Sequence, residues 1–169
     1  KGTAQNALLL NQGNAQGGVE GTFADAGINL GGSAAWDVDL ADFDGDGDLD
    51  AFFAYQGTNR MWVNRGGAQG GQAGTFDPGA QAFAGGDTRD SERAEVDGDG
   101  DLDMIAATFG GGNQVFFNEG AAGFTDSGQS LGTAMTRDVQ LADLDGDGDL
   151  DMYEANFNQP DQIWFNQGG

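Results

Sequence analysis

The stretch DFDGDGDLD, at residues 42–50, occurs three times along the chain in nearly the same form. It returns as EVDGDGDLD at residues 95–103 and as DLDGDGDLD at residues 143–151. Successive copies begin 53 and 48 positions apart, so a structural unit of about 50 residues is repeated. Repeats of this length stack against one another and share a hydrophobic core. The sequence therefore predicts a single repeat domain over residues 1–169.

Short segments of four kinds recur in a fixed order around each copy, and we call them strands A, B, C and D. Each has the length and the aromatic or β-branched content of a β-strand, and none shows the period of a helix. Strand A precedes the acidic loop, strand B follows it, strand C contains an Asn suited to closing a turn, and strand D contains a Phe. The segments are 36–41, 89–94 and 137–142 for strand A, 51–55, 104–108 and 152–156 for strand B, 7–13, 60–66, 114–120 and 162–168 for strand C, and 21–25, 74–77 and 122–126 for strand D.

This strand order predicts the fold class. Four antiparallel strands in a unit of about 50 residues are typical of a β-propeller blade. We therefore expect an all-β, β-propeller-type repeat with about three four-stranded blades, in units near residues 1–35, 36–87, 88–135 and 136–169, of which the first and last are partial. Closed propellers have about four to eight blades, so both ends of this array are expected to be open. The chain is then either a fragment of a longer propeller or completed by self-association, as a dimer or a filament.

The alternating carboxylates of each loop predict calcium sites. Ca²⁺ prefers six to eight oxygen ligands, and alternate residues of a tight loop can turn their side chains inward to supply them. In the first loop we assign the side chains of Asp42, Asp44, Asp46 and Asp50, with the carbonyl oxygen of Asp48. The corresponding residues of the other two loops are Glu95, Asp97, Asp99, Asp101 and Asp103, and Asp143, Asp145, Asp147, Asp149 and Asp151.

We expect one Ca²⁺ in each loop, about three in all, in a structural role. Gly47 is expected to provide the sharp bend of the first loop. The leucines before each final Asp are expected to anchor the loops in the apolar layer; they are Leu49, Leu102 and Leu150.

The second unit departs from the pattern of the other two. Ser91 and Arg93 replace the apolar Val38 and Leu40 in strand A, and Glu95 replaces the first Asp of the loop. We therefore expect the second calcium site to be the weakest. Either a local register change or an ion pair of Arg93 would accommodate these polar residues, and both explanations stay open.

Strand A, the loop D-x-D-x-D-G-D-L-D, strand B and the Asn-Gly ending of strand C together resemble the FG-GAP/VCBS repeat family, whose calcium-bearing blades are also found in integrin-like propellers. The resemblance extends from Ala7 to Gly168. It implies a calcium-binding, extracellular β-propeller that recognises protein or sugar ligands. No ligand-contacting motif of the family is present residue by residue.

Two other interpretations of the loops are less consistent with the sequence. A solvated acidic turn would not be expected three times in register. An EF-hand fits residues 143–154, because Glu154 occupies its twelfth position, but the other two loops have Phe53 and Ala106 there. The flanking segments are also strand-like, whereas an EF-hand needs helices.

The composition narrows the function classes. The chain has no Cys and no His, which removes thiol nucleophiles, imidazole bases and disulfides, and no carboxylate pair stands at the spacing of a glycosidase couple. We expect no enzymatic activity. Three Ca²⁺ would reduce the net charge only from −22 to −16, which disfavours nucleic-acid and anionic-membrane partners. No apolar run reaches the roughly 18 residues of a membrane span, so membrane insertion is not expected either.

These observations favour a secreted or cell-surface module that acts in cell adhesion, ligand recognition or surface assembly. A lectin-like carbohydrate-binding propeller, a structural subunit of a filament or oligomer, and the non-catalytic propeller region of a larger secreted enzyme are the alternatives. The expected partners are further blades or copies, and a glycan or protein ligand.

The start of strand A offers one candidate contact for such a partner. Trp36 stands alone there, since the other copies have Arg89 and Arg137, so it is either a ligand or partner contact or a half-buried blade edge. Asp37, Asp90 and Asp138 follow it in the three units, and we expect them to accept backbone hydrogen bonds rather than to act as acids or bases.

Overall fold

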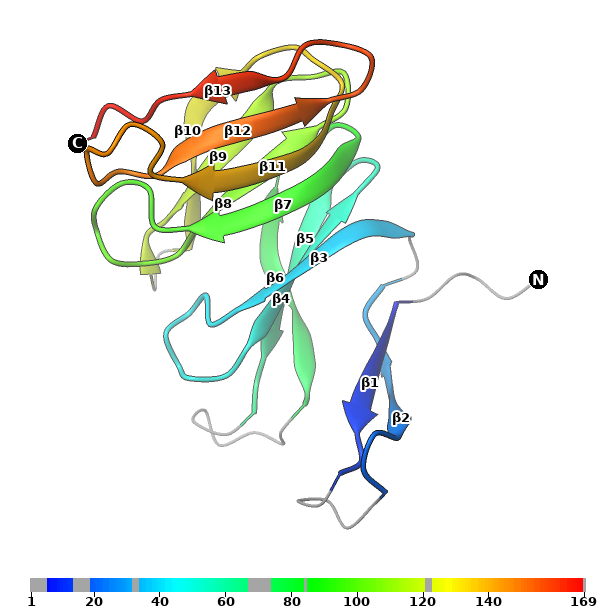
Figure 1. Ribbon diagram of the computed structural model, residues 1–169. Helices are drawn as coiled ribbons and strands as arrows, with labels where there is room; N and C mark the ends of the chain where they lie inside the picture. The colour runs from blue at the N-terminus through cyan, green and yellow to red at the C-terminus, as the bar shows by residue number, and fades with distance from the viewer. Residues whose placement is uncertain are drawn as a thin grey trace.

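The computed structural model describes residues 6–13, 19–31, 34–66, 74–83, 85–120 and 123–168. These residues form thirteen β-strands and no α-helix. The strands make four antiparallel sheets that follow one another along the chain (Figure 1). No helix in these ranges is long and apolar enough to cross a membrane.

Each sheet corresponds to one blade, and the predicted strand types are found in the predicted order. The first blade contains β1 (Ala7–Asn11) and β2 (Phe23–Asn29), and the second β3 (Ala35–Ala41), β4 (Asp50–Tyr55), β5 (Asn59–Asn64) and β6 (Phe76–Phe83). The third contains β7 (Thr88–Ala94), β8 (Asp103–Thr108), β9 (Asn113–Asn118) and β10 (Phe124–Leu131), and the fourth β11 (Thr136–Ala142), β12 (Asp151–Asn156) and β13 (Gln162–Trp164). The expected β-propeller-type repeat, incomplete as a monomer, is thus confirmed.

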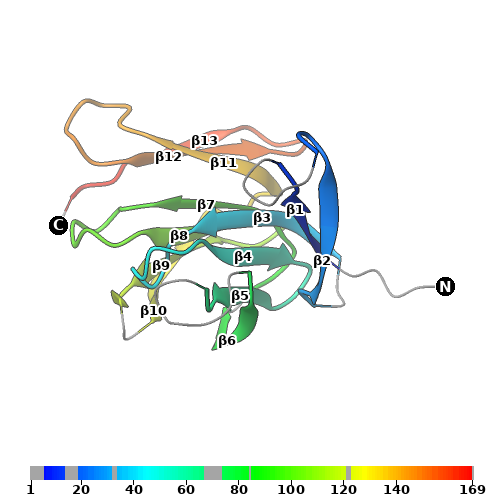
Figure 2. The same cartoon turned by 90° about the horizontal axis from the view of Figure 1, so that it is seen from below.

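The three A strands lie side by side, with β7 between β3 and β11 (Figure 2). Each pairs with its B strand in the same register, with one irregularity just before its third residue, which is Asp37, Asp90 or Asp138. The second unit therefore has no register change. Instead, Arg93 forms an ion pair with Asp39 of β3, which is the other explanation that the sequence left open.

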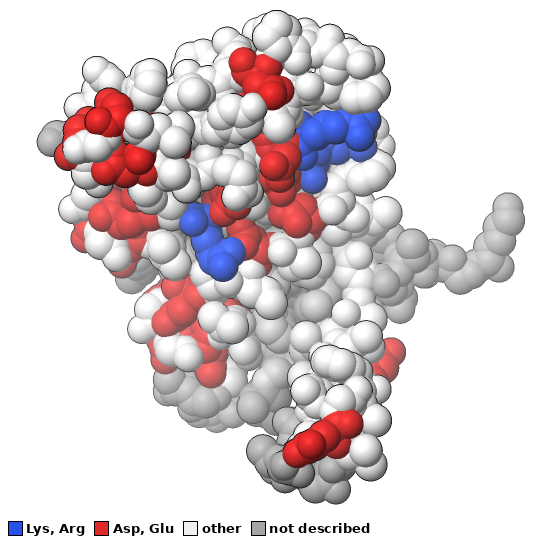
Figure 3. Space-filling view, viewed as in Figure 1, with Lys and Arg blue, Asp and Glu red and all other residues white. Residues whose placement is uncertain are grey.

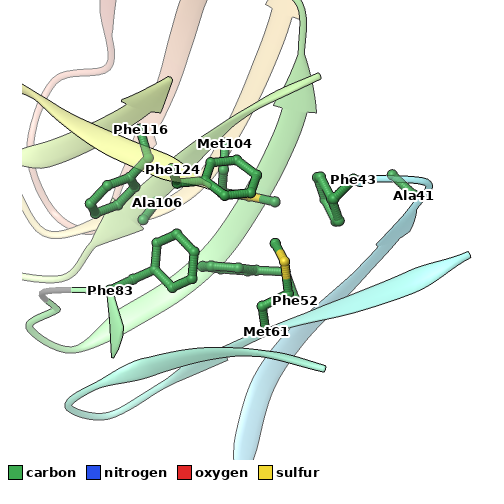
Figure 4. Packing of buried hydrophobic residues seen from close by; sticks show 9 residues of the cluster. All are labelled: Ala41, Phe43, Phe52, Met61, Phe83, Met104, Ala106, Phe116 and Phe124. Atoms are coloured by element: carbon green, nitrogen blue, oxygen red, sulfur yellow. The ribbon is translucent and has the colours of Figure 1, made fainter. Parts of the chain in front are cut away.

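The hydrophobic core lies between the blades rather than inside any one of them. Successive side chains of a strand point to opposite faces, so Phe53 packs toward the first blade while Phe52 packs toward the third. Figure 4 shows the cluster between the second and third blades. There the ring of Phe83 meets those of Phe52, Phe116 and Phe124 edge-on, at centroid distances of 5.1, 5.2 and 5.4 Å. Each blade is thus stabilised mainly by its neighbours.

Candidate metal centres in the acidic loops

The three acidic loops join strand A to strand B in the second, third and fourth blades. They lie on the same side of the molecule, at the left in Figure 1. Carboxylates gather on that side in the space-filling view (Figure 3). Stacking of the blades therefore brings the acidic loops to one edge of the array.

Two glycines shape each loop. Gly45 and Gly47 have φ angles of +74° and +95°, in the left-handed region that glycine adopts without steric cost. The glycines at the same places in the other loops are also left-handed; they are Gly98, Gly100, Gly146 and Gly148. The bend predicted at Gly47 is thus present, and Gly45 adds a second one.

The first carboxylate of each loop organises the loop backbone. Asp42 accepts hydrogen bonds from the backbone N–H groups of Asp46 at Oδ1 (3.0 Å) and of Gly47 at Oδ2 (2.9 Å). Asp143 accepts from Gly146 (2.7 Å) and Gly148 (3.2 Å) in the same way. Glu95 uses a single oxygen, Oε1, for two N–H groups, those of Asp97 (3.1 Å) and Gly98 (2.6 Å). The longer side chain thus holds its loop differently.

The last carboxylate of each loop has a second role that sequence reasoning missed. Asp50 is fully buried, and its Oδ2 accepts from the N–H of Phe43 (3.0 Å) while its Oδ1 accepts from the N–H of Asn64 (2.8 Å). Asp103 and Asp151 make the same pair of bonds in the other blades. This residue therefore ties the loop to the end of strand C. The recurring Asn at the end of strand C marks the place of this contact in the sequence, although its backbone N–H rather than its side chain makes the bond.

Burial also changes the acidity of this residue. It raises the pKa of Asp50 to about 6, the two N–H bonds oppose the shift, and the nearby carboxylates of Asp44 and Asp46 add to it. Burial raises the pKa of Asp103 as well, with smaller contributions from its loop. A cation in the loop would favour the charged form and reverse this effect.

Three carboxylates converge in each loop. Oxygens of Asp42, Asp44 and Asp50 lie within 4.8 Å of one another, and the other trios are Glu95, Asp97 and Asp99, and Asp143, Asp145 and Asp151. Two oxygens bound to the same Ca²⁺ at about 2.4 Å are at most about 4.8 Å apart, so each trio can share one ion. The second trio uses the fifth residue of the loop, whereas the first and third use the ninth.

The other predicted ligands lie outside these trios. They are Asp46 and Asp48 in the first loop, Asp101 and Asp103 in the second, and Asp147 and Asp149 in the third. Among the described residues, Oδ2 of Asp46 and Oδ2 of Asp48 are buried without a hydrogen-bond partner. Buried, unpaired carboxylate oxygens are costly, so the first loop fits an additional positive ligand.

Residues 96–154 match the family model described as FG-GAP-like repeat. The match confirms the resemblance that the loop and strand motifs indicated. It runs from the second acidic loop to β12 and so covers one full period of the array. No curated protein matches the chain.

Neighbouring repeats are linked through the Asn that ends strand C. Asn118 Nδ2 donates to the carbonyl oxygen of Phe43 (3.0 Å) and to that of Leu102 (3.1 Å). Asn166 Nδ2 donates to the carbonyl oxygen of Val96 (3.0 Å). In both cases strand C holds the acidic loop of the preceding repeat, so the first and second candidate metal centres are each supported from two blades.

The predicted leucine anchors are only partly correct. Leu102 is half-buried against the core between the second and third blades, and Leu150 is also half-buried. Leu49 is 56% exposed, and the expectation was wrong for it. The equivalent surface for Leu49 would come from inner strands of the first blade, of which the described residues contain β1 and β2 alone. Phe43, 3% exposed, is the buried apolar residue of the first loop.

Outside the loops, Trp36 is 55% exposed and begins a series of stacked cations and rings. The guanidinium of Arg89 lies 3.9 Å from the Trp36 ring centroid and 4.9 Å from that of Phe109. Arg137 continues the series, 4.3 Å from the centroid of Phe157. One ring face of Trp36 thus contacts its own chain, and its role as a ligand contact stays a prediction.

Two of the aspartates that follow the first residue of strand A accept backbone hydrogen bonds, as expected, and these bonds also link neighbouring repeats. Asp37 Oδ2 accepts from the backbone N–H (3.1 Å) and the hydroxyl (2.8 Å) of Ser91. Asp90 Oδ2 accepts from the N–H of Val139 (2.9 Å). Each therefore bonds to strand A of the next unit. The side chain of Asp138, in β11, has no hydrogen-bond partner within the described ranges.

Proposed function

We propose that this chain is a calcium-binding β-propeller module in which Ca²⁺ holds the acidic loops, and that it acts outside the cell in adhesion, ligand recognition or surface assembly. The observation that carries the proposal is the convergence of three carboxylates at equivalent places in three blades. A single acidic turn would carry little weight, whereas three equivalent ones belong to the repeat itself.

The donor set favours calcium. All candidate ligands are carboxylate or carbonyl oxygens, which suit hard cations such as Ca²⁺ and Mg²⁺ rather than soft metals. Mg²⁺ requires near-ideal octahedral geometry and keeps its waters, while Ca²⁺ accepts the irregular, carboxylate-rich arrangement of a flexible loop. Without a cation, three charges within 4.8 Å repel one another. An ion would convert this repulsion into attraction.

The position of the loops supports a structural role for the ion. The same Asp50 that belongs to the first trio accepts the N–H of Asn64 at the end of strand C. An ion bound there would stiffen the connections of strands A, B and C together. Calcium would thus stabilise the blade rather than take part in a reaction.

An extracellular location is proposed because calcium is plentiful there. Extracellular modules can use sites with a Kd of about 10⁻⁴–10⁻³ M, which cytosolic calcium would leave empty. A Kd in this range supports the location, whereas sub-micromolar affinity would favour an intracellular sensor or buffer and contradict it.

Calorimetric titration of the metal-free chain with Ca²⁺ tests the metal assignment. We expect one ion per carboxylate trio, and weaker binding of Mg²⁺. The double variant Asp42→Asn/Asp44→Asn should lose one ion. Asp126→Asn is the matched control, because Asp126 is an exposed carboxylate outside the loops and should leave the number of ions unchanged. No heat and no change in the melting temperature at about 10 mM Ca²⁺ would overturn the assignment.

A further inference from the structure

We propose that Arg137, at the junction between the third and fourth blades, binds the carboxylate of an acidic sugar. The inference names a ligand class for the recognition role proposed above and rests on that role. It does not depend on the calcium assignment, because Arg137 lies at the start of strand A and the acidic loop follows the other end of that strand.

The guanidinium of Arg137 lacks an acidic partner in a chain that is rich in carboxylates. Three other arginines form ion pairs within the described residues; they are Arg65 with Asp77, Arg89 with Asp87, and Arg93 with Asp39. Arg137 is exposed, and no carboxylate in this part of the chain lies within ion-pair distance of it. With 28 acidic and only 6 basic residues in the chain, such an arginine is suited to an anion from outside.

One substitution inside the repeat accounts for the missing acid. Arg89 and Arg137 occupy the same place of strand A in consecutive blades, and Asp87 stands two positions before Arg89. Met135 takes the place of Asp87 in the fourth blade, where it makes the equivalent bridge to the preceding blade. Arg89 is thus neutralised by its own blade, whereas the fourth blade offers a thioether at that position.

The surroundings of Arg89 show that a further blade would not supply this acid. Arg89 is followed by another blade, and its contacts are Trp36 of the preceding blade and Asp87 and Phe109 of its own. At this place the following blade adds Arg137, which lies on the ring of Phe109. By the same arrangement, a unit after the fourth would contact the ring of that blade and leave the N–H groups of Arg137 unpaired.

Aromatic rings hold the guanidinium of Arg137 in place. It lies 5.6 Å from the ring centroid of Phe109, in the third blade, and 4.3 Å from that of Phe157, in its own. A guanidinium stacks on ring faces through its plane, while the N–H donors at its edge can still pair with a planar carboxylate through two parallel hydrogen bonds. The stacked side chain is therefore ordered before a ligand arrives, which reduces the entropic cost of binding.

The backbone at this junction favours a sugar over a peptide. The N–H of Phe157 donates to the carbonyl oxygen of Met135 (2.9 Å), that of Gly110 donates to Ala134 (3.0 Å), and that of Met135 donates to Oε1 of Gln159 (2.7 Å). A peptide that adds a strand needs free main-chain groups. Here side chains remain, and a sugar is recognised through side chains, since its C–H faces pack on apolar groups and its oxygens accept hydrogen bonds.

Two further side chains suit the sugar ring beside its carboxylate. Met135 is 39% exposed and offers a flexible apolar surface. Gln159 accepts the N–H of Met135 through Oε1, which directs its amide to the same turn and leaves the two N–H donors of Nε2 for a hydroxyl group. Arginine, apolar surface and amide are thus gathered at one junction between blades.

Calorimetric titration of the calcium-loaded chain with a hyaluronan oligosaccharide, which carries a glucuronate in every second sugar, tests the inference at about 150 mM salt. We expect binding of hyaluronan, at least tenfold weaker binding of a neutral chitin oligosaccharide, and equally weak binding of poly-glutamate. Equal binding of the chitin oligosaccharide would refute the role of the carboxylate. Equal binding of poly-glutamate would refute the assignment to a sugar, and absence of hyaluronan binding at about 5 mM sugar would overturn the site.

Variants of Arg137 test the residue itself. Arg137→Gln should lower the affinity for hyaluronan about tenfold or more, because a charge-assisted pair is lost. Arg137→Lys should restore only part of it, since lysine lacks the planar fork. Arg65→Gln is the matched control, because it removes the same charge beside Asp77, after the end of β5. Equal losses in Arg137→Gln and Arg65→Gln would reveal an effect of net charge and overturn the site.

Met135→Asp gives the fourth blade the acid that Asp87 supplies in the third. The new carboxylate should pair with Arg137 and reduce hyaluronan binding about tenfold or more, while the number of bound Ca²⁺ ions stays unchanged and shows that the variant is folded. Undiminished hyaluronan binding in Met135→Asp would contradict the role of Arg137. A wild-type chain that binds Ca²⁺ but not hyaluronan would overturn this inference and leave the calcium assignment standing.

Discussion

The side-chain amide of Asn118 donates to the carbonyl oxygen of Phe43, 3.0 Å away and 75 positions earlier in the chain. The end of strand C in the third blade is thereby fixed to the acidic loop of the second. The contact is buried, since Asn118 is 2% exposed. Stability of one repeat is therefore coupled to the shape of the loop in the repeat before it.

Replacement of this residue, Asn118→Ala, should lower the stability of the chain. The carbonyl oxygens of Phe43 and Leu102 would both lose a donor, at a cost of about 1–3 kcal/mol. For a chain of this size the melting temperature should fall by about 3–10 °C, measured by calorimetry in chelator. Asn11→Ala is the control, because Asn11 ends the exposed strand β1, and it should shift the melting temperature by under about 2 °C. Equal effects of the two variants would contradict the coupling.

The substitution Glu95→Asp should strengthen calcium binding in the second loop. The shorter side chain restores the first residue of the other two loops, whose trios include the ninth carboxylate. We expect affinity at this site to rise about three- to tenfold, measured by calorimetric titration, because Asp103 would then join the ligand set. The reverse change, Asp42→Glu, should weaken the first site. A loss of affinity in Glu95→Asp would show that Asp99 is the better third ligand.

Asp90 should make stability depend on pH. Its pKa is raised to about 7, mainly by burial and also by the carboxylates of Asp37, Asp138 and Glu92, against the hydrogen bond from Val139. The folded state thus holds the proton more tightly than the unfolded chain, where the pKa is about 3.9. The stabilisation is fully present below about pH 4 and is lost as the pH rises through about 7.

Asp90→Asn should remove this dependence while keeping an oxygen for the N–H of Val139. At pH 8 the variant should be more stable than the wild type by about 1–2 kcal/mol, after allowance for solvent screening, and the difference should vanish near pH 4. Denaturant unfolding in chelator at several pH values measures it. Asp126→Asn serves as the exposed control. A variant less stable than the wild type at pH 8 would contradict a buried, destabilising charge.

The ion pair of Arg93 with Asp39 should be detectable as a coupling. Asp39 is 7% exposed, burial raises its pKa, and Arg93 lowers it. Arg93→Leu would leave a buried carboxylate unpaired and should cost about 1–2 kcal/mol, less than a fully buried pair because Arg93 is partly exposed. The double variant Asp39→Leu/Arg93→Leu removes both charges and should recover most of the loss. Leucine is chosen because Leu141 occupies the place of Arg93 in the fourth blade. Additive effects of the two single changes would refute the coupling.

Repeat order and strand type could be predicted from the sequence because their signals are local. Alternating apolar residues, turn glycines and the acidic loop recur within each unit, so the strands around Phe52, Ile105 and Tyr153 could be placed without knowing their neighbours. Candidate ligands were found in the same way. The left-handed Gly45 and Gly47 follow from the loop sequence as well, since only glycine adopts these φ angles without cost.

Only the tertiary structure decided which residues at equivalent positions of the motif have the same burial and the same contacts. Leu49 and Leu102 share one place in the motif, yet only Leu102 is half-buried, because a complete blade precedes it. Arg93 finds Asp39 across 54 positions, and Asp50 finds Asn64 at the end of strand C. The first contact depends on how blades stack and the second on how strands pair within a blade, and no local pattern encodes either. The sequence by itself determined the blade and its acidic loop, and packing between blades determined how each copy of the motif is used.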